Sequence, residues 1–295
     1  MSFDLYFGRE DSTVPAIQDL RAYFQKTFKL NDRESGGTQV WYQNDATGVY
    51  CSFDFDTADE EEADLTRFGS GLSFNLNYIR PSFFAYEAMP LVERFCKDFN
   101  LLVEDTQEET VHNGNATRLI ESWRSHNTKA VQMVTQSNAE RDDEIELCYL
   151  PEDRATEWWR YAGIREALQY SVGDEIFVPS IMILESPEKR LFSMIVWPEA
   201  IPQFFPSCDY VLVQRKKERF FRTVEEVGLV SYRDVIATVD PYLSDYTTSI
   251  GPLKYVPTES QTSVLPLLLD LDLTPLDLSS HTKVTSDGFH DVALS

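Results

Sequence analysis

Hydrophobic and polar residues follow patterns that predict the first elements of the chain. Residues 3–7 alternate with a period of two, which is typical of a strand. Apolar side chains then recur at helical spacing from Val14 to Phe28, and Pro15 lies where a first-turn proline is tolerated. Three further strands are predicted, at residues 38–43, 49–55 and 72–78.

A second amphipathic helix is predicted after Pro81. Ser82 can cap this helix, and an apolar stripe runs along it to Phe99. A short apolar segment, Leu101–Val103, then predicts a last strand. The order β-α-β-β-β-α-β is close to the split βαβ of ferredoxin-like sandwiches, with one extra strand. We therefore expect residues 1–104 to form a ferredoxin-like α+β domain, with two helices on one face of an antiparallel sheet.

A polar run, Glu104–Asn115, has the composition of a linker and marks the expected end of this domain. Beyond it the apolar periodicity resumes. Helices are predicted at residues 116–137, after Pro151 and at residues 232–243, and strands at residues 175–184, 191–197 and 210–215. We therefore expect a second α+β domain over residues 116–256.

The apolar pattern weakens from Pro257 onward, so residues 257–295 are expected to form an acidic, partly extended or flexible tail. Within it, Asp270-x-Asp272-x-Thr274 resembles the first motif of haloacid-dehalogenase-type phosphotransferases. That family places this strand first and takes its other catalytic residues from a long downstream region, and little of the chain follows here. We interpret the alternation of leucine and aspartate as a half-buried edge strand.

The composition is that of a globular protein, because 42% of the 295 residues are hydrophobic and 13% are aromatic. No stretch approaches the roughly 20 apolar residues of a membrane helix, and the N-terminus lacks a basic region followed by a long apolar one. We therefore expect a soluble, cytoplasmic protein without a membrane partner.

The net charge of −23 argues against nucleic acid as a ligand, because binding a phosphate backbone takes basic residues. A field of this sign would instead accelerate the encounter with a basic protein. The charge therefore makes a basic protein the expected partner, if there is one.

The acidic charge is densest between Asp54 and Asp64, where seven of eleven residues are carboxylates and none is basic. An EF-hand calcium loop would need an oxygen ligand at Ala58, a glycine at Asp59 and a glutamate at Leu65, so that template fails. A solvated loop, a contact surface for a cationic partner and a weak cation site remain as alternatives. The candidate partner-binding residues are Asp54, Asp56, Asp59, Glu60, Glu61, Glu62 and Asp64.

A second candidate contact lies in the aromatic stretch Trp158–Tyr161. Large aromatic side chains are frequent at the energetic centres of protein interfaces, and they also pack into their own cores. We take Trp158 and Tyr161 as candidate partner-binding residues, with core packing as the alternative.

The chain lacks the common catalytic and cofactor motifs. No glycine-rich dinucleotide fingerprint follows a strand, and neither a Walker loop nor a serine-hydrolase elbow is present. The four cysteines and four histidines do not show metal-ligand spacing, so we expect buried free thiols and surface histidines. The sequence therefore predicts no catalytic residue, no metal and no cofactor.

Three segments carry a resemblance to known proteins: MSFDLYF, NYIRPSFFAYEAMPLVERFCKDFNLLVED and VWPEAIPQFFPSCDYVLVQR. They resemble uncharacterised bacterial proteins of the kind found beside polymorphic toxins. The resemblance implies an immunity protein, which is small, acidic, cytosolic and non-enzymatic. It implies no site residues, because the segments are core-like.

The leading hypothesis is a cytoplasmic immunity protein that neutralises a basic toxin by covering its active site. A carboxylate-rich surface can cover the basic residues that a toxin acting on nucleic acid must present. Two alternatives are an enzyme whose site is assembled from residues distant in sequence, and a non-catalytic structural or adaptor module.

Overall fold

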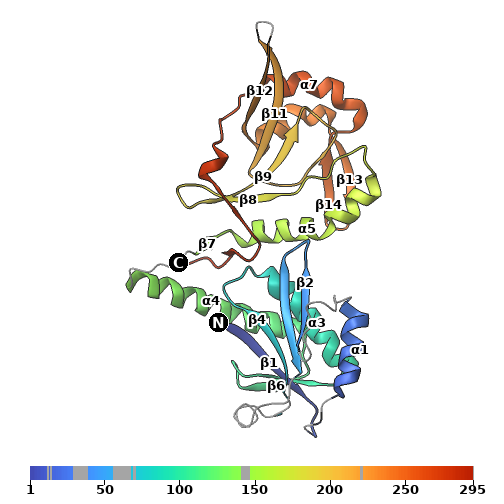
Figure 1. The fold of residues 1–295 in the computed structure, drawn as a ribbon, viewed down its shortest axis with the longest axis vertical. Helices are drawn as coiled ribbons and strands as arrows, with labels where there is room; N and C mark the ends of the chain where they lie inside the picture. Colours follow the sequence, from blue (N-terminus) through green and yellow to red (C-terminus); the bar gives the residue numbers. More distant parts are fainter. Residues whose placement is uncertain are drawn as a thin grey trace. The chain divides into compact units, whose positions relative to one another are not determined.

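The computed structural model describes residues 1–11, 13, 15–28, 39–55, 68, 71–140, 147–219 and 222–294. The chain divides into two compact units, both of them visible in Figure 1. Unit 1 comprises Met1–Leu147 together with Ser286–Ser295, and unit 2 comprises Cys148–Thr285. Both units contain helices and strands, so the fold is α+β.

Unit 1 is built on a six-stranded antiparallel sheet. Its elements are β1 (Ser2–Gly8), α1 (Ile17–Phe28), β2 (Gln39–Asn44), β3 (Val49–Phe55), β4 (Leu72–Asn77), α3 (Phe83–Phe99), β5 (Leu102–Asp105), β6 (Thr110–His112), α4 (Ala116–Glu140) and the short β16 (Phe289–His290). The strand order is β2-β3-β4-β1-β5-β6, and every neighbouring pair is antiparallel. The sequence patterns predicted β1 to β5 and the two helices among them correctly.

One face of this sheet forms the core of unit 1, and we call it the inner face. The rings of Phe7 on β1 and Phe95 on α3 lie 5.3 Å apart, and those of Phe24 on α1 and Phe53 on β3 lie 4.8 Å apart. Trp123 on α4 is fully buried. The period-two pattern places these apolar residues on one side of the strands, and helices α1, α3 and α4 cover that side.

The prediction of a linker at Glu104–Asn115 is wrong. Residues of this segment form the hairpin β5–β6, in which Val103 pairs with His112 and Asp105 with Thr110. The first unit continues through α4 to Leu147 instead of ending at residue 104. The polar composition misled the prediction because Asp105 is fully buried, with a hydrogen-bond partner on α4.

The C-terminal tail, expected to be partly extended or flexible, contains the short strands β15 (Thr282–Val284) and β16 and is packed into the two units instead of forming a separate segment. Phe289 is 2% exposed and its ring lies 6.3 Å from that of Phe83 at the start of α3. Asp291 is 5% exposed and accepts hydrogen bonds from the backbone N–H (2.8 Å) and the hydroxyl (3.0 Å) of Ser82. Ser82 does not cap α3 with its own side chain, as the sequence suggested. The carboxylate of Asp291 holds the start of the helix instead.

Unit 2 contains a five-stranded and a three-stranded sheet. Its elements are β7 (Cys148–Tyr149), α5 (Glu152–Val172), β8 (Met182–Glu185), β9 (Leu191–Pro198), β10 (Phe204–Phe205), β11 (Tyr210–Arg219), β12 (Arg222–Ser231), α6 (Tyr232–Val239), β13 (Ser244–Thr248), β14 (Gly251–Tyr255), α7 (Gln261–Asp270) and β15 (Thr282–Val284). The larger sheet has the order β12-β11-β9-β8-β15, and the smaller one β10-β14-β13. Strands β9 and β11 are parallel.

The leucine-rich run as far as Asp270 forms a helix in unit 2 instead of an edge strand, whereas Thr274, beyond the helix, forms an antiparallel bridge with Leu229 of β12. In α7, Val264 and Leu268 are fully buried and lie four residues apart, which places them on the same face of the helix. The buried guanidinium of Arg215 on β11 donates to the carbonyls of Leu268 and Leu271 at 2.7 Å each. The burial of this helical face and its hydrogen bonds to Arg215 favour a helix over the strand that the period-two pattern predicts.

Candidate functional site

The candidate site is the face of the unit 1 sheet opposite the inner face, which we call the outer face. The strand register aligns its side chains in rows. One row contains Asp4, Asn75, Ser52 and Trp41, and the next contains Tyr6, Ser73, Asp54 and Gln39. The period of two that buries one face of each strand therefore brings polar and aromatic residues together on the other.

Asp4 is held on this face by two neutral donors. The hydroxyl of Ser2 donates to its Oδ2 at 2.9 Å, and the side-chain amide of Asn75 donates to its Oδ1 at 2.6 Å. Asn75 lies directly opposite Asp4 on the neighbouring strand. These contacts fix the orientation of the carboxylate without neutralising its charge.

Asp54 is held in the same manner on β3. Gln39 donates its side-chain amide to Oδ1 at 2.7 Å, and Ser52 donates its hydroxyl to Oδ2 at 3.2 Å. The indole N–H of Trp41 donates to Gln39 Oε1 at 2.8 Å, so the amide is itself oriented. Trp41 is 36% exposed. The two neighbouring rows thus combine oriented carboxylates with an accessible aromatic ring.

Neither Asp4 nor Asp54 forms an ion pair within the described residues. Arg80 contacts Tyr50 of β3: its guanidinium donates to the Tyr50 hydroxyl at 2.8 Å and lies 5.9 Å from the ring centroid. A carboxylate can accept about four hydrogen bonds, and each of these two uses one on each oxygen. Both retain acceptor capacity for an ammonium or guanidinium group, and the Trp41 ring can add a cation–π contact.

The sequence-based candidate residues are only partly placed on this face. Asp54 lies on it, whereas Asp56, Asp59, Glu60, Glu61, Glu62 and Asp64 lie outside the described residues. Asp4, Asn75 and Ser52 were missed because each is a single polar residue in a strand. The sequence does show these residues at the polar positions of alternating segments. Which of them lie next to each other follows only from the strand register.

The prediction that Tyr161 is a surface anchor is wrong. Tyr161 is 3% exposed, and its hydroxyl donates to the carbonyl of Pro179 at 2.7 Å. Trp158 is partly buried against the core of unit 2 and donates its indole N–H to the carbonyl of Ile181 at 3.1 Å. Both residues anchor α5 to its own unit, which was the alternative that the sequence left open.

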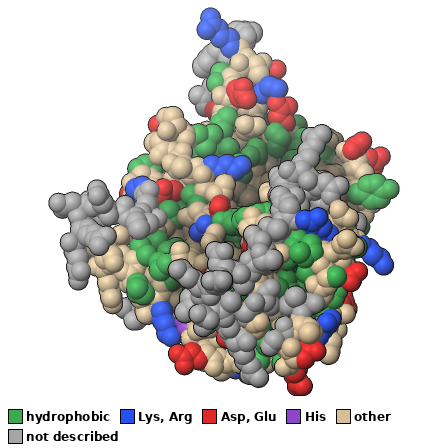
Figure 2. Space-filling model, turned by 60° about the horizontal axis from the view of Figure 1, so that its bottom comes forward, with side chains coloured by type: hydrophobic (Ala, Val, Ile, Leu, Met, Phe, Trp, Pro, Cys, Tyr) green, Lys and Arg blue, Asp and Glu red, His purple; other side chains and the backbone are tan. Residues whose placement is uncertain are grey.

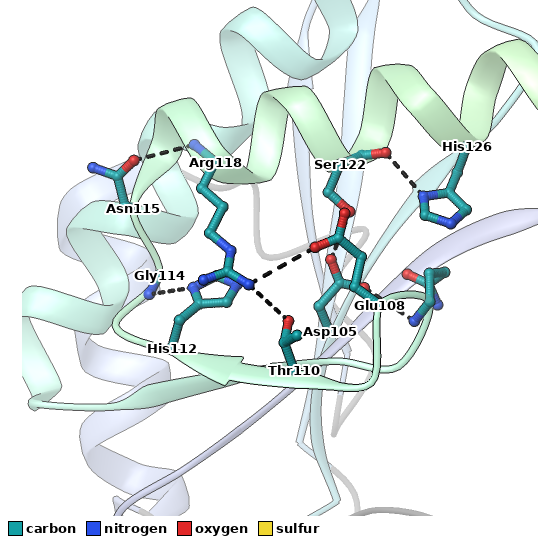
Figure 3. A network of polar contacts seen from close by, with 10 residues as sticks. Asp105, Glu108, Thr110, His112, Gly114, Asn115, Arg118, Ser122 and His126 are labelled. Carbon is teal, nitrogen blue, oxygen red and sulfur yellow. Dashed lines mark hydrogen bonds and ion pairs between the residues drawn. The ribbon is translucent and has the colours of Figure 1, made fainter.

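A second polar cluster lies between the hairpin β5–β6 and α4 (Figure 3). Arg118 on α4 donates to Thr110 Oγ1 at 3.0 Å and lies 3.8 Å from Glu108 Oε2. Ser122 on the same helix donates to Asp105 Oδ2 at 2.7 Å. The backbone N–H of Gln107 donates to Asp105 Oδ1 at 3.0 Å. The cluster joins the hairpin to the helix.

The cluster contains serine, aspartate and histidine, but not in the geometry of nucleophilic catalysis. Ser122 donates directly to the carboxylate, whereas a catalytic serine donates to a histidine. His126 Nδ1 lies 3.0 Å from the backbone carbonyl of Ser122, and His112 Nδ1 accepts from the N–H of Gly114 at 3.1 Å. Burial and the nearby charge of Arg118 lower the pKa of His112, which favours its neutral form. These contacts have a structural role.

Three other kinds of feature would indicate a function in the described part of the chain: a surface patch of one charge, a metal site and a membrane-spanning helix. In the view of Figure 2, acidic, basic and apolar side chains are interspersed, so the described surface seen there has no large patch of one sign. Across the residues that the structure describes, no group of three His, Cys, Asp or Glu side chains is placed to hold a metal ion. No helix among them is long and apolar enough to cross a membrane.

The cysteines are free, as the sequence predicted. Cys51, Cys96 and Cys208 are buried, and Cys148 is partly buried. Burial raises the pKa of Cys96 and of Cys208 to about 12, so these thiols are protonated at neutral pH and are poor nucleophiles. They do not form a second candidate site.

No known family model, curated protein or solved structure matches this chain.

Proposed function

We propose that this chain is a non-enzymatic cytoplasmic protein that binds a basic protein partner through the outer face of unit 1. The observation that carries the proposal is the pair Asp4 and Asp54, which are oriented by neutral donors and lack an ion pair within the described residues. Preorganised anionic acceptors beside an exposed tryptophan suit the lysine and arginine side chains of a partner.

The overall charge supports the same partner class. A net charge of −23 attracts a basic protein over long distances and accelerates encounter at low salt. Asp54 is also the first residue of the acidic stretch that continues in the sequence to Asp64. We propose that the stretch mainly raises the association rate, since exposed charges contribute little to final affinity.

The partner that fits best is a toxin whose active site is basic, and the chain would then act as an immunity protein. Toxins that act on nucleic acid or nucleotides must present cationic side chains, and an acidic protein can cover them. The resemblance to proteins found beside polymorphic toxins supports this assignment.

We also propose that unit 1 is a ferredoxin-like sandwich with an additional strand at each edge. The inner four strands have the order β3-β4-β1-β5. Helix α1 lies in the chain between β1 and β3, and α3 lies between β4 and β5, which supports two split βαβ units. In this interpretation β2 and β6 are the added edge strands.

The binding proposal is tested by capturing the partner from the source cell with the full chain and identifying it by mass spectrometry. The test variant combines Asp4→Asn with Asp54→Asn, which keeps size and most hydrogen bonding but removes two charges. The charge-matched control combines Asp174→Asn with Asp272→Asn, which are exposed residues of unit 2. We expect a basic protein that the wild type and the control retain and that the test variant loses at least tenfold.

Two results would contradict the proposal. One is that the wild type retains no basic protein above the background of the empty resin. The other is that both double variants retain the captured protein equally, because the outer-face carboxylates would then not contribute to binding.

A further inference from the structure

The edge of the larger unit 2 sheet offers backbone groups for pairing. Strand β12 is the last strand of that sheet, and β11 and β12 extend past the other elements of unit 2 in Figure 1. On its outer side, Leu229 exchanges backbone hydrogen bonds with Thr274 at 2.8 and 3.0 Å. This short ladder covers only the C-terminal end of β12. Gly228 permits the close approach, since an added Cβ would lie 2.8 Å from the carbonyl oxygen of Thr274.

In an antiparallel strand, the backbone N–H and C=O groups of successive residues point to alternate sides. This alternation determines which backbone groups of β12 are exposed. Because the N–H and C=O of Leu229 point outward, those of Val227, Glu225 and Thr223 point outward as well. None of these three residues has a backbone partner on that side among the described residues. Two apolar side chains of the same strand are also exposed: Val224 by 38% and Val227 by 42%. A long exposed edge with apolar residues is a template for strand addition.

We propose that a second copy of this chain pairs with this edge, β12 against β12 in antiparallel orientation, centred on Val224. A two-fold axis perpendicular to the sheet places the same face of both copies on the same side. The residue at the centre of the paired strands therefore lies opposite the same residue of the other copy. Centring on Val224 places Arg222 opposite Glu226 of the other copy, twice, and Val224 opposite Val224. Thr223 and Glu225 then exchange hydrogen bonds across the axis.

The neighbouring registers are electrostatically worse. Centring the pair on Glu225 or on Glu226 would place two carboxylates directly opposite each other, which is destabilising. The register centred on Val224 is the one in which both opposite charges and apolar side chains meet. The contact involves about six residues of each copy, so we expect a weak dimer, with a dissociation constant on the order of 10–100 µM.

Sedimentation equilibrium of the full chain, from a few micromolar to several hundred micromolar, tests whether the dimer exists. We expect a reversible monomer–dimer equilibrium that Arg222→Glu weakens at least tenfold, because it places two like charges opposite each other twice. The control is Arg233→Glu, the same change of charge at an exposed residue of α6, which should leave the equilibrium unchanged. Wild-type protein that stays monomeric throughout this range, or that forms open-ended aggregates, overturns the proposal.

Cysteine cross-linking tests the register. Val224→Cys places two thiols directly opposite each other, within the Cα separation that a disulfide allows. Thr223→Cys places its two thiols diagonally, roughly 8 Å apart between Cα atoms, which is too far. We expect mild oxidation to give at least tenfold more cross-linked dimer for Val224→Cys. Equal yields from the two variants, or a higher yield from Thr223→Cys, would contradict this register.

Discussion

Arg215 is a buried, heavily bonded cation of unit 2. It is 5% exposed, its guanidinium lies 2.8 Å from Glu226 Oε2, and the same group donates to two carbonyls at the end of α7. A buried charge is tolerated only when its partners are in place, and removing one partner leaves the others unsatisfied. The residue therefore fastens α7 to the sheet.

Arg215→Met should destabilise unit 2 by about 3–5 kcal/mol, because two carbonyls and the partly exposed carboxylate of Glu226 lose a donor. The measurement is urea unfolding followed by the fluorescence of the unit 2 tryptophans. Lys216→Met is the control, since Lys216 is 57% exposed where it pairs with Glu199 and should cost less than about 1 kcal/mol. Equal losses from the two variants would show that the buried network is not stabilising.

His112 links the stability of unit 1 to pH. Its pKa is lowered by burial, with a further contribution from Arg118, and its Nδ1 accepts a backbone hydrogen bond only in the neutral form. The unfolded chain therefore binds the proton more readily, and the contribution of neutral His112 is present above about pH 6.5 and is lost as the pH falls.

We expect the wild type to lose stability between pH 7.5 and pH 5.5 more steeply than His112→Gln, which cannot titrate. The measurement is the urea midpoint of unit 1 at each pH for both proteins. Parallel pH profiles would mean that His112 does not contribute to this dependence.

At the scale of elements, the sequence predicted the helices and strands whose burial follows from their own pattern of apolar side chains. The alternation of residues 3–7 predicted β1, and the apolar stripe to Phe99 predicted α3. Strand β6, which completes a hairpin with β5, was missed because the polar composition around Asp105 is typical of a solvent-exposed linker. Asp105 is buried, and Ser122, 17 residues later, donates to it. Composition alone does not reveal a partner on another element.

The candidate site shows the same division between local and distant information. Asp54 was identified from the density of acidic residues around it. Asp4 was not, because its significance depends on Asn75, which lies 71 residues away in sequence. The outer face is a property of strand register, and register is set by tertiary pairing.

The start of α3 gives a prediction for the C-terminal segment. Asp291→Ala removes the acceptor for two hydrogen bonds from Ser82, one of them from a backbone N–H at the helix start. We expect unit 1 to lose about 1–3 kcal/mol, as for the loss of a helix cap with a buried donor. Leu294→Ala, at a residue that is 44% exposed, is the control. If the C-terminal segment were flexible, both variants would leave the temperature of thermal unfolding unchanged.

At the scale of the whole molecule, the net charge of −23 implies self-repulsion that opposes folding. Salt shortens the Debye length from about 30 Å at 0.01 M to about 3 Å at 1 M, which relieves this repulsion. We expect the urea midpoint to rise between 0.01 M and 0.5 M sodium chloride, and to rise equally in potassium chloride. A midpoint that falls or does not change would show that local charge pairs outweigh the overall field.

The central claim is that the outer face of unit 1 contacts a basic partner, and hydroxyl-radical footprinting of the complex tests it most directly. Trp41 is 36% exposed on that face, and Tyr170 in unit 2 is 91% exposed and serves as the internal control. We predict that the captured partner slows oxidation of Trp41 at least threefold and leaves Tyr170 unchanged. Oxidation of Trp41 at the same rate in the complex and in the free chain would contradict the claim.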